Sequence, residues 1–304
     1  MNRNYVLISP CRNEETYMRQ TLDSVVEQSE KPAKWVIVDD GSTDGTNEIL
    51  HEYADIYDWI EIVKKPNRGH RSVGPGVIET FYVGYQIIDP NNYEYLCKLD
   101  LDLRLPAKYF EILMDRMEAD FQLGTCSGKS YVEQDGQLVS ERKGDEMSLG
   151  MTKFYRTTCF ADIGGFVHEV MWDGIDCHLC RMKGWKACSW DEAELRFVHL
   201  RPMGSSQQNI YVGRMRHGYG QYFMGTGFTY MIASSVNRMI EKPYVIGGLA
   251  MLWGWIKSFM NNKPRYGDKE FRKFLNRYQW QALFLGKEKA IGNIHESFES
   301  EKSK

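Results

Sequence analysis

Two aspartates that stand one residue apart, Asp100 and Asp102, come directly after a short apolar segment, Tyr95 to Leu99. In an extended segment alternate side chains share a face, so we expect the two carboxylates to lie side by side. Their repulsion raises the cost of ionising both, and a bound divalent cation removes that cost. Oxygen ligands suit Mg²⁺ or Mn²⁺, which usually also take oxygens from substrate phosphates. The alternative is a solvated acidic turn, which is disfavoured by the flanking Leu99, Leu101, Leu103 and Leu105.

A second acidic cluster, Asp39-Asp40-Gly41-Ser42-Thr43-Asp44, follows the apolar segment Trp35 to Val38. Carboxylates at the end of a strand suit the recognition of ribose hydroxyls or of a base edge. The alternative is structural, because Asp and Gly form turns and because Thr43 or Asp44 would cap a following helix. Both clusters therefore need a scaffold that brings strand ends together.

The first half of the chain alternates short apolar runs with segments of helical period. Strands are predicted for Tyr5 to Ser9, Trp35 to Asp39, Ile60 to Lys64 and Tyr95 to Leu99. Helices are predicted for Thr16 to Gln28, Thr46 to Tyr57 and Val77 to Ile88. This alternation predicts an α/β fold with a mainly parallel sheet, helices on both faces, and ligands beyond the carboxyl ends of the strands.

The second half is less regular. A hairpin is predicted at Gln134-Asp135-Gly136, helices at Arg156 to Ile163 and Asp173 to Lys183, a strand at Arg196 to Leu200, and helices from Gly220 onward. We therefore expect a catalytic domain over residues 1–215 and a helical segment over 216–304. Within the domain, a nucleotide-binding half would span 1–103 and an acceptor half 104–215.

Composition excludes some classes of function. The net charge is −3, so no positive field favours nucleic acid and no nucleic-acid partner is expected. The seven cysteines are scattered, and the single CxxC pair, Cys177 and Cys180, has no second pair nearby. Reduced thiols are therefore favoured over a zinc or redox centre. The amino-terminal apolar run is too short for a signal peptide, so we expect a cytoplasmic catalytic region.

The chain resembles glycosyltransferase family 2 in three motifs that occur in the family's order. These are Ile8 to Glu15 (ISPCRNEE), Ile37 to Thr46 (IVDDGSTDGT) and Lys98 to Leu103 (KLDLDL). Three ordered motifs are far more specific than a lone D-x-D. The resemblance implies a GT-A fold and inverting transfer of a sugar from a nucleotide diphosphate donor, most commonly UDP, to an acceptor hydroxyl. It also implies a divalent cofactor, Mn²⁺ or Mg²⁺.

The same resemblance assigns roles in the donor site. Asp39 would line the nucleoside pocket with Pro10 and Glu14, Asp100 would lie near the ribose or a metal-bound water, and Asp102 would hold the cation and the diphosphate. The family often has a basic loop where Asn67 to Gly74 stands, and its arginines would contact the diphosphate, unless the loop is merely solvated. The expected donor-binding residues are Pro10, Arg12, Glu14, Asp39, Asp40, Arg68, Arg71, Lys98 and Asp100.

A general base and a further metal ligand are also implied. Measured back from Gly184, Asp173 stands where the family has its base, although the usual Glu-Asp pair is here Trp172-Asp173. Asp176 is the competing candidate, and Asp173 would alternatively serve only as a helix cap. His199 would complete the metal shell with Asp102, although a lone histidine is more often structural.

The segment Pro243 to Ile256 carries no charged residue and is followed by a series of cations. It is shorter than the roughly 20 apolar residues that span a bilayer. A helix in the membrane interface fits better, at the inner face of the cytoplasmic membrane. The alternative is packing on the catalytic domain or on a second subunit in a homo-oligomer. The expected acceptor is a growing glycan or a lipid-linked saccharide of cell-surface polysaccharide synthesis.

Two other functions compete with this interpretation. A nucleotidyltransferase also uses an α/β sheet with paired carboxylates, but its Gly-rich basic loop after the first strand is absent here. A catalytically silent nucleotide-sugar-binding or scaffold protein would bind donor without turnover, and the complete acidic set argues against it. That set comprises Asp39, Asp100, Asp102 and Asp173.

Overall fold

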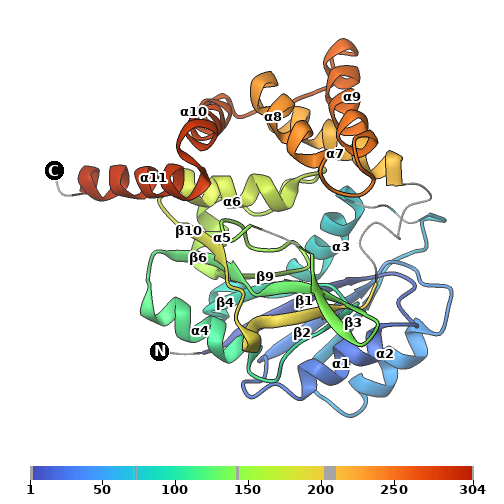
Figure 1. The fold of residues 1–304 in the computed structure, drawn as a ribbon. Helices are drawn as coiled ribbons and strands as arrows, with labels where there is room; N and C mark the ends of the chain where they lie inside the picture. Colours follow the sequence, from blue (N-terminus) through green and yellow to red (C-terminus); the bar gives the residue numbers. More distant parts are fainter. Residues whose placement is uncertain (1–2, 71, 73, 142–143, 202–209, 303–304) are drawn as a thin grey trace. The chain divides into compact units, whose positions relative to one another are not determined.

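The chain forms two compact units in a computed structural model, which describes residues 3–70, 72, 74–141, 144–201 and 210–302 (Figure 1). The first unit comprises Met1–His168 and Trp185–Pro202, and the second comprises Glu169–Gly184 and Met203–Lys304. The candidate donor-binding residues all fall in the first unit, whereas both candidate bases fall in the second.

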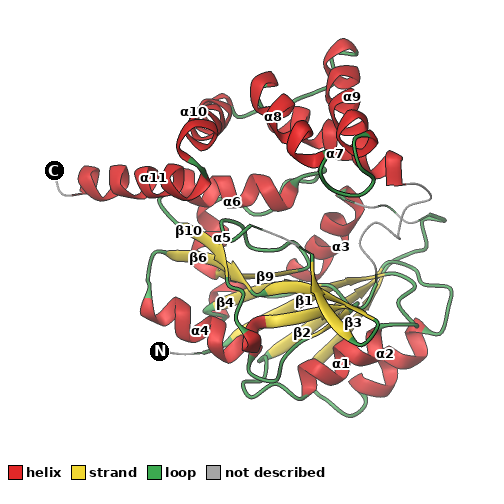
Figure 2. Ribbon diagram, in the orientation of Figure 1, coloured by secondary structure: helices red, strands yellow, loops and turns green. Residues whose placement is uncertain are grey.

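A seven-stranded sheet organises the described part of the first unit, in the order β10-β6-β9-β4-β1-β2-β3 (Figure 2). The four predicted strands are confirmed and run parallel as neighbours: β1 (Tyr5–Cys11), β2 (Lys34–Asp39), β3 (Ile60–Lys64) and β4 (Tyr95–Leu99). β1, β2 and β4 are buried on both faces, which explains their near-continuous apolar runs, whereas the edge strand β3 is only partly buried. Their carboxyl ends bring Cys11, Asp39 and Leu99 to one edge.

The helices of the first unit cover both faces of this sheet (Figure 2). One face carries α1 (Met18–Val26), α2 (Thr46–Ala54) and α4 (Tyr109–Ala119), and the other carries α3 (Pro75–Tyr85) and α5 (Thr157–Asp162). Gly84 lets α3 approach closely, because a Cβ there would lie 2.8 Å from Ile8 and 2.9 Å from Val38. The predicted mainly parallel α/β architecture is confirmed.

Three strands of this sheet, β6, β9 and β10, lie outside the sequence prediction. β9 (Thr152–Arg156) runs antiparallel between β4 and β6 (Leu123–Ser127), and β10 (Lys186–Ser189) completes the edge beside β6. The sheet is therefore mixed. The helix expected to begin at Arg156 begins one residue later, because Arg156 is still paired with Tyr95 in β9.

A smaller four-stranded sheet has the order β5-β11-β7-β8. The predicted hairpin is confirmed as β7 (Lys129–Gln134) and β8 (Gln137–Ser140), and both turn residues, Asp135 and Gly136, have positive φ. β11 (Arg196–His199) pairs parallel with β7 and antiparallel with β5 (Leu103–Arg104). This pairing sets His199 opposite Leu103, next to Asp102.

The second unit is helical throughout its described residues. Its helices are α6 (Trp172–Met182), α7 (Ile210–Met224), α8 (Phe228–Arg238), α9 (Ile246–Met260), α10 (Lys269–Leu285) and α11 (Lys287–Lys302). The carboxyl-terminal helices thus begin ten residues before the predicted Gly220. None of the described helices combines the length and the apolar character that crossing a bilayer requires.

The grouping of α6 with the carboxyl-terminal helices differs from the boundary expected after residue 215. The His178 ring of α6 packs against the rings of Tyr278 and Phe271 of α10, with centroids 5.0 and 6.5 Å apart. These aromatic contacts place α6 in the second unit, although it interrupts the first unit in sequence. The functional division into nucleotide-binding and acceptor halves stays a prediction.

Candidate active site

The loop after β2 holds Asp39 and Asp40 in different ways. Asp39 is buried, and its Oδ1 accepts hydrogen bonds from the Ser42 backbone N–H (2.9 Å) and hydroxyl (2.5 Å). Its Oδ2 accepts one from Asn47 at 3.1 Å. Asp39 therefore shapes the turn after β2, as the structural alternative predicted. The N-cap of α2 is Gly45, however, so the expected cap by Thr43 or Asp44 is wrong. The turn contacts of Asp39 do not remove a binding role, because the carboxylate remains at the sheet edge.

Asp40 is the centre of a basic cluster. Its Oδ1 lies 3.0 Å from Lys65 Nζ and 2.8 Å from Arg68 Nη2, while its carbonyl oxygen accepts from Arg12. Arg68 also pairs with Glu79 at 3.0 Å, and these carboxylates raise the pKa of its guanidinium, with Asp40 as the main cause. Arg68 and Arg12 thus lie close to the second acidic motif, and their role in donor binding stays a prediction. Arg71, the other predicted arginine, lies outside the described residues.

The loop after β1 is tied to the loop after β2. The Glu14 N–H donates to Thr46 Oγ1 (2.8 Å). The Asn13 N–H donates to Ser42 Oγ, and Asn13 Oδ1 accepts from the Thr43 N–H. Asn13 has a φ of 53°, a conformation that asparagine adopts more readily than most residues. The predicted Pro10, Glu14 and Asp39 are thereby held at the ends of two adjacent strands.

Lys98 fixes the first aspartate of the D-x-D motif. Its side chain is almost fully buried in β4, and its Nζ donates to Asp100 Oδ1 (2.5 Å) and to the Gly150 carbonyl (2.9 Å). Removal from water raises the pKa of Asp100, and the neighbouring Asp102 carboxylate adds to this although Lys98 opposes it. Lys98 therefore positions Asp100, and its predicted role in donor binding stays a prediction.

The second aspartate, Asp102, meets residues from β11 in a bend between β4 and β5. Its Oδ2 lies 3.8 Å from His199 Nε2 and 3.2 Å from Arg201 Nε, and its carbonyl accepts from the Leu200 N–H at 2.8 Å. The Arg201 guanidinium also pairs with Glu14 and stacks over Tyr17 at 5.1 Å. One arginine thus bridges two carboxylates that the sequence assigned to donor and metal binding.

Glu141 stands behind His199. Both of its carboxylate oxygens lie 3.3 Å from His199 Nδ1, so the other ring nitrogen, Nε2, is directed at Asp102. Burial would lower the pKa of His199, but the nearby carboxylates of Asp102 and Glu141 outweigh it and raise this pKa to about 9. Burial would likewise raise the pKa of Asp102, but His199 and Arg201 outweigh it and lower that pKa.

The donor chemistry of this group fits a divalent cation. A carboxylate oxygen and an imidazole nitrogen 3.8 Å apart can both reach an ion at ordinary ligand distances, and a carboxylate behind the imidazole is the usual support for a metal-bound histidine. Among the described residues, clusters of three or more His, Cys, Asp or Glu suited to a metal do not occur. The remaining ligands would have to be phosphate oxygens and waters, which Mg²⁺ commonly retains.

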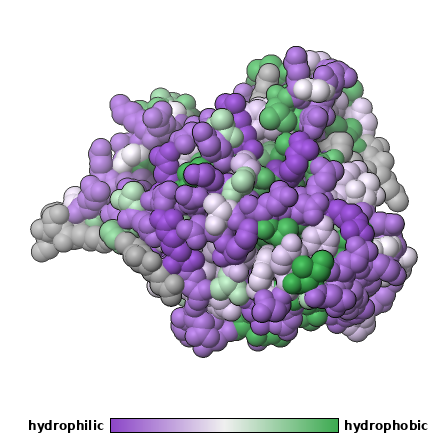
Figure 3. All heavy atoms as spheres, turned by 90° about the horizontal axis from the view of Figure 1, so that it is seen from below, coloured by the Kyte–Doolittle hydropathy of each residue, from purple (hydrophilic) through white to green (hydrophobic). Residues whose placement is uncertain are grey.

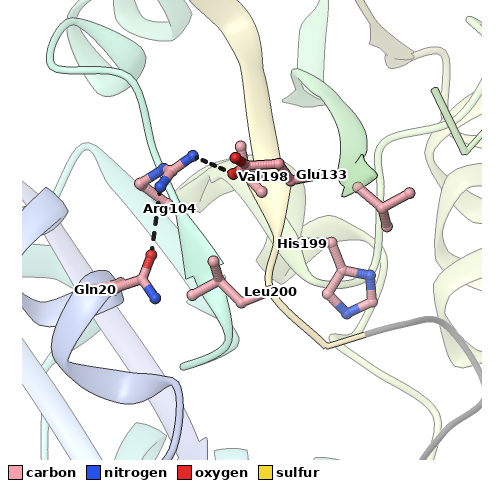
Figure 4. A pocket seen from close by; sticks show the side chains of 7 residues that line it. Gln20, Arg104, Glu133, Val198, His199 and Leu200 are labelled. Carbon is pink, nitrogen blue, oxygen red and sulfur yellow. Dashed lines mark hydrogen bonds and ion pairs between the residues drawn. The ribbon is translucent and has the colours of Figure 1, made fainter. Parts of the chain in front are cut away.

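A pocket of about 370 Å³ borders His199 on the small sheet (Figure 4). Figure 4 shows Arg104 between its two partners, Glu133 at 3.1 Å and Gln20 at 3.5 Å, with His199 apart from them. The pocket shares only His199 with the predicted site residues. Its remaining lining residues are Gln20, Arg104, Val132, Glu133, Val198 and Leu200.

The two candidate bases lie on α6 in the second unit and differ in exposure. Asp173 is partly exposed in the first turn of the helix, whereas Asp176 is 1% exposed and accepts a hydrogen bond from the Cys177 N–H. A base must reach the acceptor hydroxyl, so burial disfavours Asp176. The assignment of Asp173 stays a prediction.

Two residues of the site had no signal in the sequence. Glu141 follows the outer strand of the hairpin without any motif, and Lys65 is a single lysine after β3. Their roles come from tertiary contacts, to His199 and to Asp40 respectively. Metal-binding histidines usually donate their other ring nitrogen to a carboxylate, so a partner of this kind could have been expected for His199. The sequence does not indicate that Glu141 is this partner.

The fold is that of the GT-A glycosyltransferases. A mannosyltransferase of Pyrobaculum calidifontis, solved in complex with GDP-Man and Mn²⁺, matches 97% of this chain and 87% of its own, with a TM-score of 0.52 and 16% identity. At that identity the likeness concerns the fold alone.

Sequence comparison finds relatives of the amino-terminal part of the chain. The glycosyl transferase family 2 model matches residues 6–73. Glycosyltransferase GlyA of Streptococcus pneumoniae is 38% identical over 46% of this chain and 19% of its own length. The protein named "Putative teichuronic acid biosynthesis glycosyltransferase TuaG" of Bacillus subtilis is 42% identical over 43% of this chain and 48% of its own. These matches support glycosyltransferase family 2, and they cover less than half of this chain and about half or less of the relatives' own length.

Proposed function

We propose that the protein transfers a sugar, with inversion, from a nucleotide diphosphate donor to an acceptor hydroxyl in the synthesis of a cell-surface polysaccharide or lipid-linked glycan. UDP is the favoured nucleotide. The observation that carries the proposal is the group formed by Asp102, His199 and Glu141 beside the carboxyl ends of β1, β2 and β4. This is the edge where open α/β sheets bind nucleotides.

The residues of the first unit divide into those that would touch the donor and those that hold them in place. Asp39 and Glu14 would contact the nucleoside, and Arg68 would neutralise phosphate charge. Lys98 positions Asp100, and Glu141 positions His199. A bound cation would neutralise charge that develops on the departing diphosphate, with Asp102 and His199 as its protein ligands.

A proton must leave His199 before its Nε2 can bind a cation. With a pKa of about 9, the imidazole is mostly protonated at neutral pH, and only the neutral ring binds a metal. Arg201 is a second competitor, because it already pairs with Asp102 and Glu14. Without a bound metal ion, the negative charges of Asp102 and Glu14 are thus neutralised by His199 and Arg201.

Arg201→Gln is expected to tighten the binding of Mn²⁺ in the absence of nucleotide, by roughly tenfold or more. The reason is that a charge-assisted hydrogen bond to Asp102 no longer has to be broken. Calorimetric titration with Mn²⁺ measures this directly. Arg104→Gln is a matched control, since the Arg104 guanidinium contacts Glu133 and Gln20. Unchanged affinity in Arg201→Gln would mean that this guanidinium does not compete with the cation.

The proposed function is tested by calorimetric binding of UDP, GDP and dTDP, with and without Mn²⁺. We expect one nucleotide to bind, and to bind more tightly with the cation, because Asp102 and the phosphates would share it. Measurement of donor turnover then separates an enzyme from a silent nucleotide-sugar-binding protein, which would bind without turnover. Failure of all three nucleotides to bind would contradict the proposal.

A further inference from the structure

α9 presents two different faces, and both are apolar. One face packs against α7 and α8 through small residues: a Cβ on Gly254 would lie 2.1 Å from the Met215 carbonyl oxygen, and one on Gly248 would lie 2.3 Å from that of Ser235. Met251 and Trp255 are buried on the same face. Close backbone approach therefore fixes which side of α9 points inward.

The opposite face of α9 is exposed although it is equally apolar. Its side chains recur at helical spacing and are about half exposed or more: Ile246, Leu249, Trp253 and Met260. α8, which packs beside α9, exposes a similar row of Phe228, Ile232 and Val236, and Ile240 follows. We call these two rows the α8–α9 apolar surface.

An exposed apolar surface of this kind is unusual on a protein that is surrounded only by water. A helix that is apolar on all sides is normally covered on all sides, and single exposed apolar residues are ordinary only when scattered. The face of the molecule seen in Figure 3 has that ordinary character, with hydrophilic residues predominating and hydrophobic groups between them. The α8–α9 apolar surface instead needs an occupant.

The charges around the surface indicate the kind of occupant. Residues 228–267 contain a single acidic residue, Glu241, against five basic ones, whereas the whole chain has a net charge of −3. The exposed Lys257 lies on α9 itself, and Lys242 lies just before it. The basic residues are Arg238, Lys242, Lys257, Lys263 and Arg265.

We propose that the α8–α9 apolar surface docks the protein on an anionic lipid bilayer, with α9 lying in the plane of the interface. α9 has 15 residues and is therefore about 22 Å long, less than the roughly 30 Å of the hydrocarbon core. Apolar and tryptophan side chains would enter the boundary between headgroups and acyl chains, while the lysines would meet acidic headgroups. The inference is independent of the proposed activity.

A second copy of the chain fits this surface less well. A two-fold contact brings the same patch of each copy together, so the basic flanks would face one another and repel. An anionic bilayer, in contrast, complements both the apolar rows and their flanks. Self-association is nevertheless measurable and forms part of the test.

The test is co-sedimentation of the full chain with vesicles made of equal parts phosphatidylglycerol and phosphatidylcholine, or of phosphatidylcholine alone. We expect binding to the anionic vesicles that weakens with added salt. Leu249→Glu and Trp253→Ser should each lower the partition coefficient roughly tenfold. Lys257→Gln should lower it about fivefold on anionic vesicles and leave it unchanged on neutral ones.

Ile56→Glu is the matched control, because Ile56 is also highly exposed but lies just after α2 in the first unit. It should bind vesicles as the wild type does. Thermal melting should show all variants folded, since each altered side chain is at the surface. Vesicle binding that is absent, or equally weakened by Ile56→Glu, would overturn the inference. A mass by light scattering that is dimeric and falls in Leu249→Glu, without vesicle binding, would assign the surface to a second copy.

Discussion

Asp102→Asn is expected to abolish cation-dependent turnover of the donor, lowering kcat by roughly 10³-fold or more. Asparagine keeps the size of the side chain but removes the charge and one of the two acceptor oxygens. The expected loss corresponds to several kcal/mol of charge stabilisation, at 1.36 kcal/mol for each factor of ten. Calorimetry should also show that Mn²⁺ no longer strengthens nucleotide binding. The measurement of activity is the rate at which nucleotide diphosphate is released from the donor.

The local contacts of Asp102 make a control necessary. Its carboxylate pairs with Arg201 and lies near His199, so the variant releases two cations as well as a metal ligand. The Leu200 N–H, however, donates to the Asp102 backbone carbonyl, which the substitution retains. Asp115→Asn, at an exposed ion pair with Arg3, is a matched change elsewhere in the first unit. Turnover in Asp102→Asn close to that of Asp115→Asn would remove Asp102 from the site.

Asp173→Asn is expected to remove transfer while nucleotide binding stays within about twofold of the wild type. General base catalysis contributes about 10²- to 10⁴-fold, so kcat should fall by that order. The base acts on the acceptor hydroxyl and not on the nucleotide, which is why binding and turnover should separate. Steady-state transfer and calorimetric nucleotide binding, measured on the same preparation, provide the two readouts.

Asp176→Asn is the comparison that decides between the two candidates. Asp176 is buried in α6 and accepts a hydrogen bond from the Cys177 N–H, so we expect its substitution to lower the melting temperature and to affect activity only in proportion to folded protein. A fully folded Asp176→Asn without transfer, together with an active Asp173→Asn, would reverse the assignment.

The sequence predicted the elements whose signals are local. β1, β2 and β4 are largely apolar runs because these strands are buried on both faces. The V-D-D-G and D-x-D motifs follow directly from the ends of β2 and β4. β6 and β9 escaped prediction because their runs include Gly124, Thr125, Thr152 and Lys153. Polar residues of this kind are accommodated by neighbours that only the tertiary fold supplies, such as Ser148 beside Thr125.

The sequence predicted which types of residue form the site better than it predicted which of these residues pair with one another. Lys98 and Arg68 were predicted to bind the donor, which stays a prediction, and the sequence did not indicate that they pair with Asp100 and Asp40. The same-face argument for Asp100 and Asp102 assumed an extended chain, whereas residues 101 and 102 form a bend after β4. Ion pairs between residues distant in sequence, such as Arg201 with Glu14, produce no sequence pattern from which they could be predicted.

The position of β9 has a consequence for how the chain folds during synthesis. β1 pairs with β2 and β2 with β3 across single crossovers, whereas β4 pairs with β1 across the whole segment from Tyr5 to Tyr95 and can join only after all three. The outer edge of β4 stays unpaired until β9 (Thr152–Arg156) has been synthesised. β6 is joined to β4 only through β9. At ordinary rates of translation this leaves β4 with unpaired backbone groups for several seconds. The nascent protein therefore passes through a stage in which its nucleotide-binding strands are assembled but one edge remains open to chaperones or to misassociation.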